Sequence, residues 1–78
     1  MKKMNIRLSY DKASNTLYID WCDAYGEQDS KTIADGVLAR LNPETNVVES
    51  LEVLDFETRF RAEGKLELPI IGPLQLAS

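Results

Sequence analysis

The sequence contains no histidine and a single cysteine, Cys22. Without histidine, a serine or cysteine nucleophile would lack its usual neighbouring base. One thiol cannot close an intrachain disulfide, so packing alone must hold the fold, as is usual for intracellular proteins. We therefore interpret Cys22 as a structural thiol rather than as a nucleophile.

Long hydrophobic runs are also missing. No stretch approaches the roughly 20 apolar residues that span a bilayer. The opening MKKMNIRLSY is basic, but no apolar segment follows it, so a secretory signal is not predicted. We expect no membrane partner and a cytoplasmic location.

Positive charge is scarce. Nine Lys and Arg are scattered among thirteen Asp and Glu, which gives a net charge of −4. A nucleic-acid-binding domain normally carries a basic patch, so a DNA or RNA partner is disfavoured. The stretch DKASN lacks the spacing and the glycine of a calcium loop, and the chain has no Gly-rich phosphate loop. Accordingly, neither a cofactor nor a metal site is predicted.

The length of 78 residues corresponds to one domain, and a hydrophobic content of 44% is ordinary for a globular protein. A domain of this size buries only about 60–65% of the surface that its unfolded chain exposes, so its stability is marginal. Either the core is used efficiently or a partner chain adds to it.

Two short segments share one pattern, residues 11–16 (DKASNT) and 42–47 (NPETNV). Each begins with Asp or Asn, whose side chain accepts a backbone hydrogen bond two residues further on. Each also carries an asparagine, which tolerates a left-handed backbone. Runs typical of strands flank both segments, so both are predicted to be hairpins with four-residue loops.

The register of the first hairpin follows from the alternation of side chains along a strand. With Asp11 opposite Thr16, large apolar residues collect on one face. These residues are Ile6, Leu8, Tyr10, Leu17, Ile19 and Trp21. Arg7 then lies opposite Asp20 on the other face, as an opposite-charge pair.

The second hairpin is less regular. With Asn42 opposite Val47, Arg40 faces Glu49 and both faces of the hairpin are partly apolar, which indicates that both are partly covered. A bulge would shift this register, and that alternative stays open. The polar segment between the hairpins, residues 23–36, is predicted to be a long loop that holds one short strand start.

A short helix is predicted near residues 56–63, with Asp55 as its N-cap and Gly64 as its end. Phe56 and Phe60 lie four residues apart, so one face of the helix can pack on the sheet. A helix of about two turns does not persist alone in water, so this packing must hold it.

The last segment, KLELPIIGPLQLAS, is rich in large apolar residues, while two prolines and a glycine keep it from forming a helix or a central strand. Left exposed, it would be an apolar patch of a kind that soluble monomers avoid. It therefore packs on the sheet or on a neighbouring subunit, and we favour a dimer. The residues expected to do so are Leu66, Leu68, Ile70 and Ile71.

The predicted fold is mainly β. It has a four-stranded antiparallel sheet from two consecutive hairpins, one short helix near 56–63 and an extended apolar C-terminal tail. Residues 1–64 form the single domain, and residues 65–78 form the tail that packs on the sheet or on a partner subunit.

The order of YD, NTLYI, DGVL and LEVLDFE resembles that of the small bacterial proteins grouped as domain of unknown function 2283, over about residues 6–58. The matching positions are Tyr10, Asp11, Leu17, Tyr18, Ile19, Gly36, Val37, Leu38, Leu51, Glu52, Val53, Leu54 and Asp55. The chain has Asn15 and Asn46 where aspartate and glycine are usual. The resemblance implies a small cytoplasmic β-rich domain with no established activity. Because some relatives are encoded beside small toxin-like proteins, it also implies a binding role like that of an antitoxin.

Two functions are weighed. The first is a non-catalytic module that forms a homodimer or binds a small basic protein, since opposite charge speeds association. The alternative is a small metal-dependent hydrolase that uses Asp20, Glu52 and Asp55, with Tyr18 nearby. So small a domain offers little concave volume for a substrate, so catalysis is not expected.

Glu52 is the candidate of most interest, because it is a carboxylate between Leu51 and Val53. The simpler interpretation is a surface residue that pairs with Arg7 or Arg40. The alternative is a half-buried acid that marks a site. The simpler interpretation is favoured.

Overall fold

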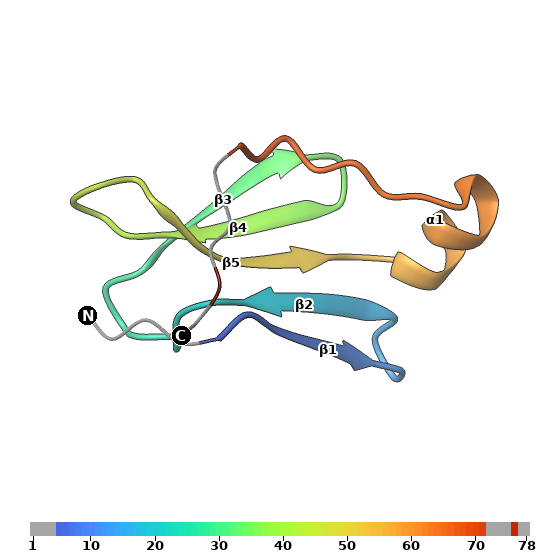
Figure 1. The fold of residues 1–78 in the computed structure, drawn as a ribbon, viewed down its shortest axis with the longest axis horizontal. Helices are drawn as coiled ribbons and strands as arrows, with labels where there is room; N and C mark the ends of the chain where they lie inside the picture. The colour runs from blue at the N-terminus through green and yellow to red at the C-terminus, as the bar shows by residue number, and fades with distance from the viewer. Residues whose placement is uncertain (1–4, 72–75, 77–78) are drawn as a thin grey trace.

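The computed structural model describes residues 5–71 and 76. Its elements are β1 (Arg7–Asp11), β2 (Thr16–Asp20), β3 (Asp29–Ala34), β4 (Val37–Leu41), β5 (Val48–Val53) and α1 (Phe56–Glu63). The strands form one antiparallel sheet in the order β1-β2-β5-β4-β3 (Figure 1). The mainly β prediction is confirmed, but the sheet has five strands rather than four.

The additional strand is β3, which the sequence interpretation assigned largely to a loop. It pairs with β4 through a tight turn at Asp35 and Gly36, where Gly36 has a φ of 72°. An Asp-Gly pair between two runs of strand residues is a strong hairpin signal, so the sequence did carry the information. The polar composition of β3, DSKTIA, concealed it, because edge strands need little apolar character.

The first hairpin has the predicted register. Asp11 lies opposite Thr16 and Arg7 lies opposite Asp20. The ion pair expected from that register is wrong, however. Arg7 instead pairs with Asp23, with 3.6 Å between Nη2 and Oδ1, while Asp20 accepts a hydrogen bond of 2.6 Å from the Ser50 hydroxyl. The register fixes which residues lie opposite each other, but a long exposed arginine side chain can still reach a different acid nearby.

The second hairpin has a β-bulge at Glu49, which makes its register differ from the predicted one. Leu41 lies opposite Val48, yet Arg40 lies opposite Ser50, so Glu49 is the extra residue on β5. The predicted pairing of Arg40 with Glu49 is therefore wrong by one position. The shift places Ala39 opposite Leu51 and sorts the apolar side chains of both strands onto one face.

That face carries the core. Its buried cluster consists of Val37, Ala39, Leu51 and Val53. Phe56 from α1 and the tail residues Leu66, Leu68 and Ile70 pack against this cluster and are themselves half-buried. Helix and tail thus lie on the same side of the sheet, and the polar face is the opposite one.

The tail shows a mixed outcome. Leu66, Leu68 and Ile70 pack on the sheet of their own chain, as one of the two predicted arrangements required. Ile71 is 98% exposed and contributes nothing to this packing. The apolar Leu74 lies outside the described residues.

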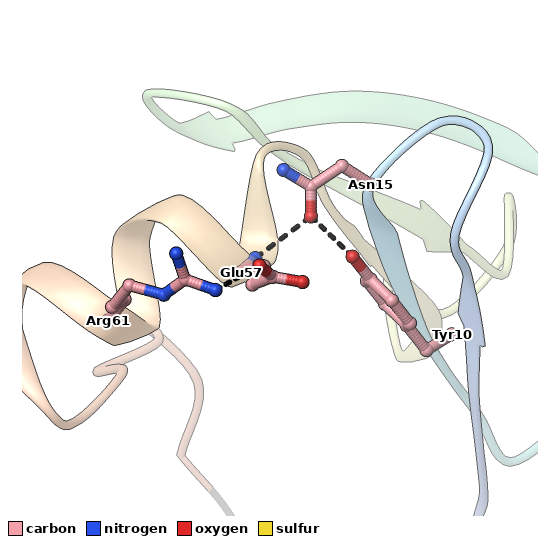
Figure 2. Close-up of polar contacts among 4 residues, drawn as sticks. All are labelled: Tyr10, Asn15, Glu57 and Arg61. Atoms are coloured by element: carbon pink, nitrogen blue, oxygen red, sulfur yellow. Dashed lines mark hydrogen bonds and ion pairs between the residues drawn. The ribbon is translucent and has the colours of Figure 1, made fainter.

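The helix has the predicted bounds, but another residue caps it. Asp55 occupies the N-cap position with a left-handed φ of 54°, and its side chain makes no capping hydrogen bond. Asn15, in the first hairpin turn, performs this function instead (Figure 2). Its side-chain Oδ1 accepts from the Glu57 backbone N–H at 2.9 Å, and its backbone carbonyl accepts from the Phe56 N–H at 3.0 Å. The assignment of Asp55 as a side-chain cap is therefore corrected.

The same Asn15 oxygen accepts a second hydrogen bond, of 2.7 Å, from the Tyr10 hydroxyl (Figure 2). The backbone of Asn15 is left-handed, with φ 53°. The Tyr10 ring lies 6.0 Å from the Phe56 ring, which in turn stacks on Phe60 at 5.6 Å. One turn residue thus fixes the helix to the first hairpin.

This junction predicts a difference between two matched substitutions. Asn15→Ala should lower the free energy of unfolding by about 2 kcal/mol, because it removes the helix cap and strains the left-handed backbone. Asn46→Ala should lower the free energy of unfolding by only about 1 kcal/mol. Asn46 has a similar φ of 61°, but its bond to the Asn42 carbonyl is made by its backbone N–H, which alanine keeps. Urea denaturation followed by circular dichroism measures both values. Equal losses would contradict the assigned capping role.

Candidate functional site

Three of the predicted site residues meet on the polar face of the sheet. Tyr18 on β2 lies opposite Glu52 on β5, and Asp20 lies opposite Ser50 one step along the same strands. On the other side of β5, Leu38 and Arg40 of β4 face Glu52 and Ser50. A patch of Tyr18, Asp20, Arg40, Ser50 and Glu52 results, which we call the polar patch.

Each acid of the polar patch has a partner. The Glu52 carboxylate forms an ion pair with Arg40, at 3.3 Å between Oε1 and Nη2. This is one of the two arginines predicted for it, but the Glu52 side chain is half-buried, at 20% exposure, rather than on the open surface. Asp20 accepts from the Ser50 hydroxyl. Partly exposed pairs of this kind contribute on the order of 1 kcal/mol or less, so the polar patch is a modest contributor to stability.

The other predicted residues lie elsewhere. Asp55 stands at the start of α1, on the segment that follows β5, and does not join the polar patch. Leu66, Leu68 and Ile70 lie against the core on the opposite face of the sheet. Asp20 and Glu52 therefore share the polar patch, but the third predicted carboxylate, Asp55, does not join them.

A cluster that the sequence interpretation missed surrounds Glu49. This side chain is only 4% exposed, although it is a carboxylate. Its Oε1 accepts from the Tyr25 hydroxyl at 2.6 Å and from the Gln28 amide at 2.9 Å, and its Oε2 accepts from the Asn42 amide at 3.4 Å. We call these four residues the Glu49 cluster. Buried carboxylates are tolerated where several donors satisfy them, as here.

The strand order explains why a carboxylate is buried at this position. β2 is second and β3 is last in the sheet, so residues 21–28 must cross the ends of β5 and β4. Tyr25 and Gln28 lie in this crossing segment, and Asn42 begins the turn between β4 and β5. The Trp21 indole N–H also donates to the Val48 carbonyl, at 2.7 Å. The bulge thus turns Glu49 towards the crossing segment and holds it to the sheet.

The electrostatics agree with a structural role. Burial acts to raise the pKa of the Glu49 carboxyl, but hydrogen bonds from Gln28, Tyr25 and Asn42 together outweigh it and lower the pKa below its ordinary value. The hydrogen bond to Glu49, with burial, raises the pKa of Tyr25 to about 12. At neutral pH the pair is a carboxylate and a phenol, so the carboxylate is not poised to exchange a proton.

Cys22 lies beside this cluster and is buried. Burial, reinforced by the Glu49 charge, raises the pKa of its thiol, which lowers the thiolate fraction. Its interpretation as a structural thiol fits this environment.

Within residues 5–71 and 76, no group of three or more Cys, Asp and Glu is placed to hold a metal ion. A groove of about 490 Å³ runs beside β3, lined by Asp29, Ser30, Lys31, Ile33, Leu41 and Asn46. None of the predicted site residues and no member of the Glu49 cluster lines this groove, so it is separate from both.

Comparisons with protein-family models, with curated proteins and with solved structures find no match to this chain. The resemblance noted from the sequence therefore stays a prediction. In the part of the chain that the structure describes, no helix has the length and apolarity needed to cross a membrane.

The Glu49 cluster predicts a pH-dependent effect of Glu49→Gln. At neutral pH the variant should lose about 1–3 kcal/mol of unfolding free energy, because a charged acceptor of three hydrogen bonds is replaced. The folded pKa of Glu49 is depressed, so its stabilisation is present above the ordinary glutamate pKa and is lost as pH falls through the folded pKa. The difference in unfolding free energy between the wild type and the variant should therefore become smaller at acidic pH. Chemical denaturation at several pH values measures it, and a gap that stays constant would count against the assignment.

Tyr25 predicts the behaviour at high pH. Its pKa is raised to about 12, so the folded state keeps a proton that the unfolded state releases near the ordinary value of 10.0. The stabilisation from this group is complete below pH 10.0 and declines as pH rises towards 12. Ultraviolet titration should show a late-ionising tyrosine that Tyr25→Phe removes. Glu49→Gln should bring that ionisation to lower pH, and an unaltered titration would refute the link.

Proposed function

We propose that this protein is a non-catalytic module that associates with a second copy of itself or with another protein. The observation that carries the proposal is that several large apolar side chains are exposed while the buried core is small. Among the described residues the largest fully buried side chain is that of Val53, so the core is thin. Large apolar side chains are exposed at Ile6, Leu8, Tyr10, Val47, Leu54, Phe60, Ile71 and Leu76.

Of these, Ile6, Leu8 and Tyr10 alternate along β1 and its approach, so they lie on one face of an edge strand. Exposed apolar side chains gathered in this way mark interaction sites in small soluble proteins. Burying part of it on a partner adds to the stability that so thin a core supplies, at about 25 cal/mol for each Å² removed from water. The net charge of −4 favours a basic partner where the partner is a different protein, because opposite fields speed the encounter.

The arrangement of the acids supports a non-catalytic role. Glu52 pairs with Arg40, Asp20 accepts from Ser50, and Glu49 is fully occupied by donors. Each of these three carboxylates has a local structural partner, and Asp55 lies apart from them at the start of α1. We therefore propose association in preference to metal-dependent hydrolysis.

Sedimentation velocity over a wide range of protein concentration tests the proposal, with native mass spectrometry to give the stoichiometry. We expect a species heavier than the monomer whose population rises with concentration. Glu52→Gln should leave both the fold and the association unchanged, since Glu52 lies on the polar face. A monomer at every concentration that carries a metal ion, and loses it in Asp20→Asn and Glu52→Gln, would overturn the proposal in favour of the hydrolase.

A further inference from the structure

The two edges of the sheet differ in how they are protected. β3, at one edge, carries Asp29 and Lys31 and has an irregular register between Thr32 and Ala34. A lysine and an irregular register of this kind hinder the pairing of an edge strand with another chain. β1, at the other edge, also carries charges, at Arg7 and Asp11, but it pairs without interruption with β2 and contains neither proline nor lysine. Its outer edge is therefore open to pairing.

The backbone groups on that outer edge can be identified. The Trp21 N–H donates to the Glu49 carbonyl, so the backbone of Trp21 points from β2 towards β5. Because the direction of the backbone N–H and C=O groups alternates along an antiparallel strand, those of Asp20 and Tyr18 point towards β1. The backbone groups of their partners on β1, Arg7 and Ser9, point towards β2. Leu8 and Tyr10 therefore direct their N–H and C=O groups outwards.

The side chains of the same residues are apolar and exposed. Ile6 is 46%, Leu8 is 63% and Tyr10 is 38% exposed, on the face that carries the core. The helix and the described tail cover the cluster on β4 and β5, but they leave this row open. No strand of the described residues pairs with the outer edge of β1. An edge strand of this kind with an exposed apolar row has the features of a site for strand addition.

We propose that β1 pairs antiparallel with β1 of a second copy, centred on Ser9. The inference rests on the proposed function and names the surface that it uses. In this register Leu8 faces Tyr10 of the partner subunit, and these are the residues whose backbone groups point outwards. Arg7 faces Asp11 of the partner subunit on the polar face. Two-fold symmetry repeats every contact, so the single strand is complementary to itself in hydrogen bonds, apolar contacts and charge.

The charged residues distinguish the pairing centred on Ser9 from the alternative pairing centred on Leu8. Centring the pair on Leu8 would also align the outward backbone groups, but Arg7 would then face Ser9. Only the pairing centred on Ser9 brings Arg7 to Asp11, at the closely spaced positions where cross-strand side chains interact most. Both are accessible, because β1 is exposed throughout and the bond of Arg7 to Asp23 joins two exposed side chains.

The assembly is a continuous ten-stranded sheet, obtained by doubling the five strands of one copy. The two-fold axis stands perpendicular to the sheet, so both helices lie on the same face. Tyr10 links the new contact to the rest of the fold, because its ring lies 6.0 Å from Phe56 of α1. A five-residue strand pair buries less than the roughly 800 Å² per partner of a standard interface, so we expect a dimer that dissociates on dilution.

The first test places a lysine on each edge in turn. Leu8→Lys puts a charge in the middle of the proposed contact and should weaken the dimer about tenfold or more, while the exposed site leaves the monomer folded. Thr32→Lys on β3 is the matched control and should dimerise as wild type does. Sedimentation velocity measures dissociation, and thermal denaturation checks the fold. Equal dimerisation of the two variants would overturn the β1 contact, yet would leave self-association standing.

The second test uses charge reversal in two separate chains. Arg7→Glu and Asp11→Lys should each dimerise poorly, because each homodimer repeats a like-charge contact twice. Their mixture restores both opposite-charge pairs and should form the heterodimer preferentially, as native mass spectrometry would show. A random mixture, or no dimer of either kind from well-folded chains, would overturn the register.

Asp11 also accepts turn hydrogen bonds from the Ala13 N–H and the Ser14 hydroxyl, so the fold of Asp11→Lys must be checked. If that chain does not fold, the comparison of Leu8→Lys with Thr32→Lys still decides the contact. A wild type that stays monomeric at all concentrations would refute both the contact and self-association. Binding to a different protein would then be the surviving form of the proposed function.

Discussion

The bulge at Glu49 is the constraint on which the rest of the structure depends. An even ladder between β4 and β5 would scatter apolar side chains over both faces, as the unbulged register shows. One extra residue brings Val37 and Ala39 opposite Val53 and Leu51 and so creates a single apolar face. The same residue supplies the carboxylate that holds the segment between β2 and β3. Sheet, core and crossing segment therefore all rely on one irregularity.

The second linking element is Asn15, which joins the helix to the first hairpin. The polar groups at the start of α1 find their partners 42 residues away in the chain rather than in a local cap. The helix is too short to persist alone, and it has no buried residue of its own. Its place on the apolar face is therefore set by the hairpin turn and by the contact of Phe56 with Tyr10.

Local features were predictable from the sequence, and features that join distant segments were not. The first hairpin followed from its turn residues and from regular alternation, and the helix followed from Gly64 and the spacing of its phenylalanines. The fifth strand was missed because its residues are polar, although Asp35 and Gly36 signalled the turn. The bonds of Tyr25 and Gln28 to Glu49, and of Asn15 to the start of α1, join residues more than twenty positions apart, which no local pattern reveals.

The candidate site divides in the same way. Tyr18, Asp20 and Glu52 were named as candidates from the sequence, but their common face depends on the pairing of β2 with β5, which the sequence did not predict. The pairing of Glu52 with Arg40 was one of two options, and the sheet order decided it. The importance of Glu49 was hidden, because a carboxylate in a strand normally indicates an exposed position. Its burial is possible because hydrogen bonds from three donors offset the cost of removing the carboxylate from water.

The strand order also has a consequence for the folding pathway. β1 and β2 form one local hairpin, and β3, β4 and β5 form a meander of consecutive neighbours. Only the pairing of β2 with β5 joins strands that are far apart in sequence, and closing that long loop costs the most chain entropy. We infer that the two local units form early and that their docking along β5 limits the rate. The open edge of β1 would then be accessible to other chains before the native sheet is complete.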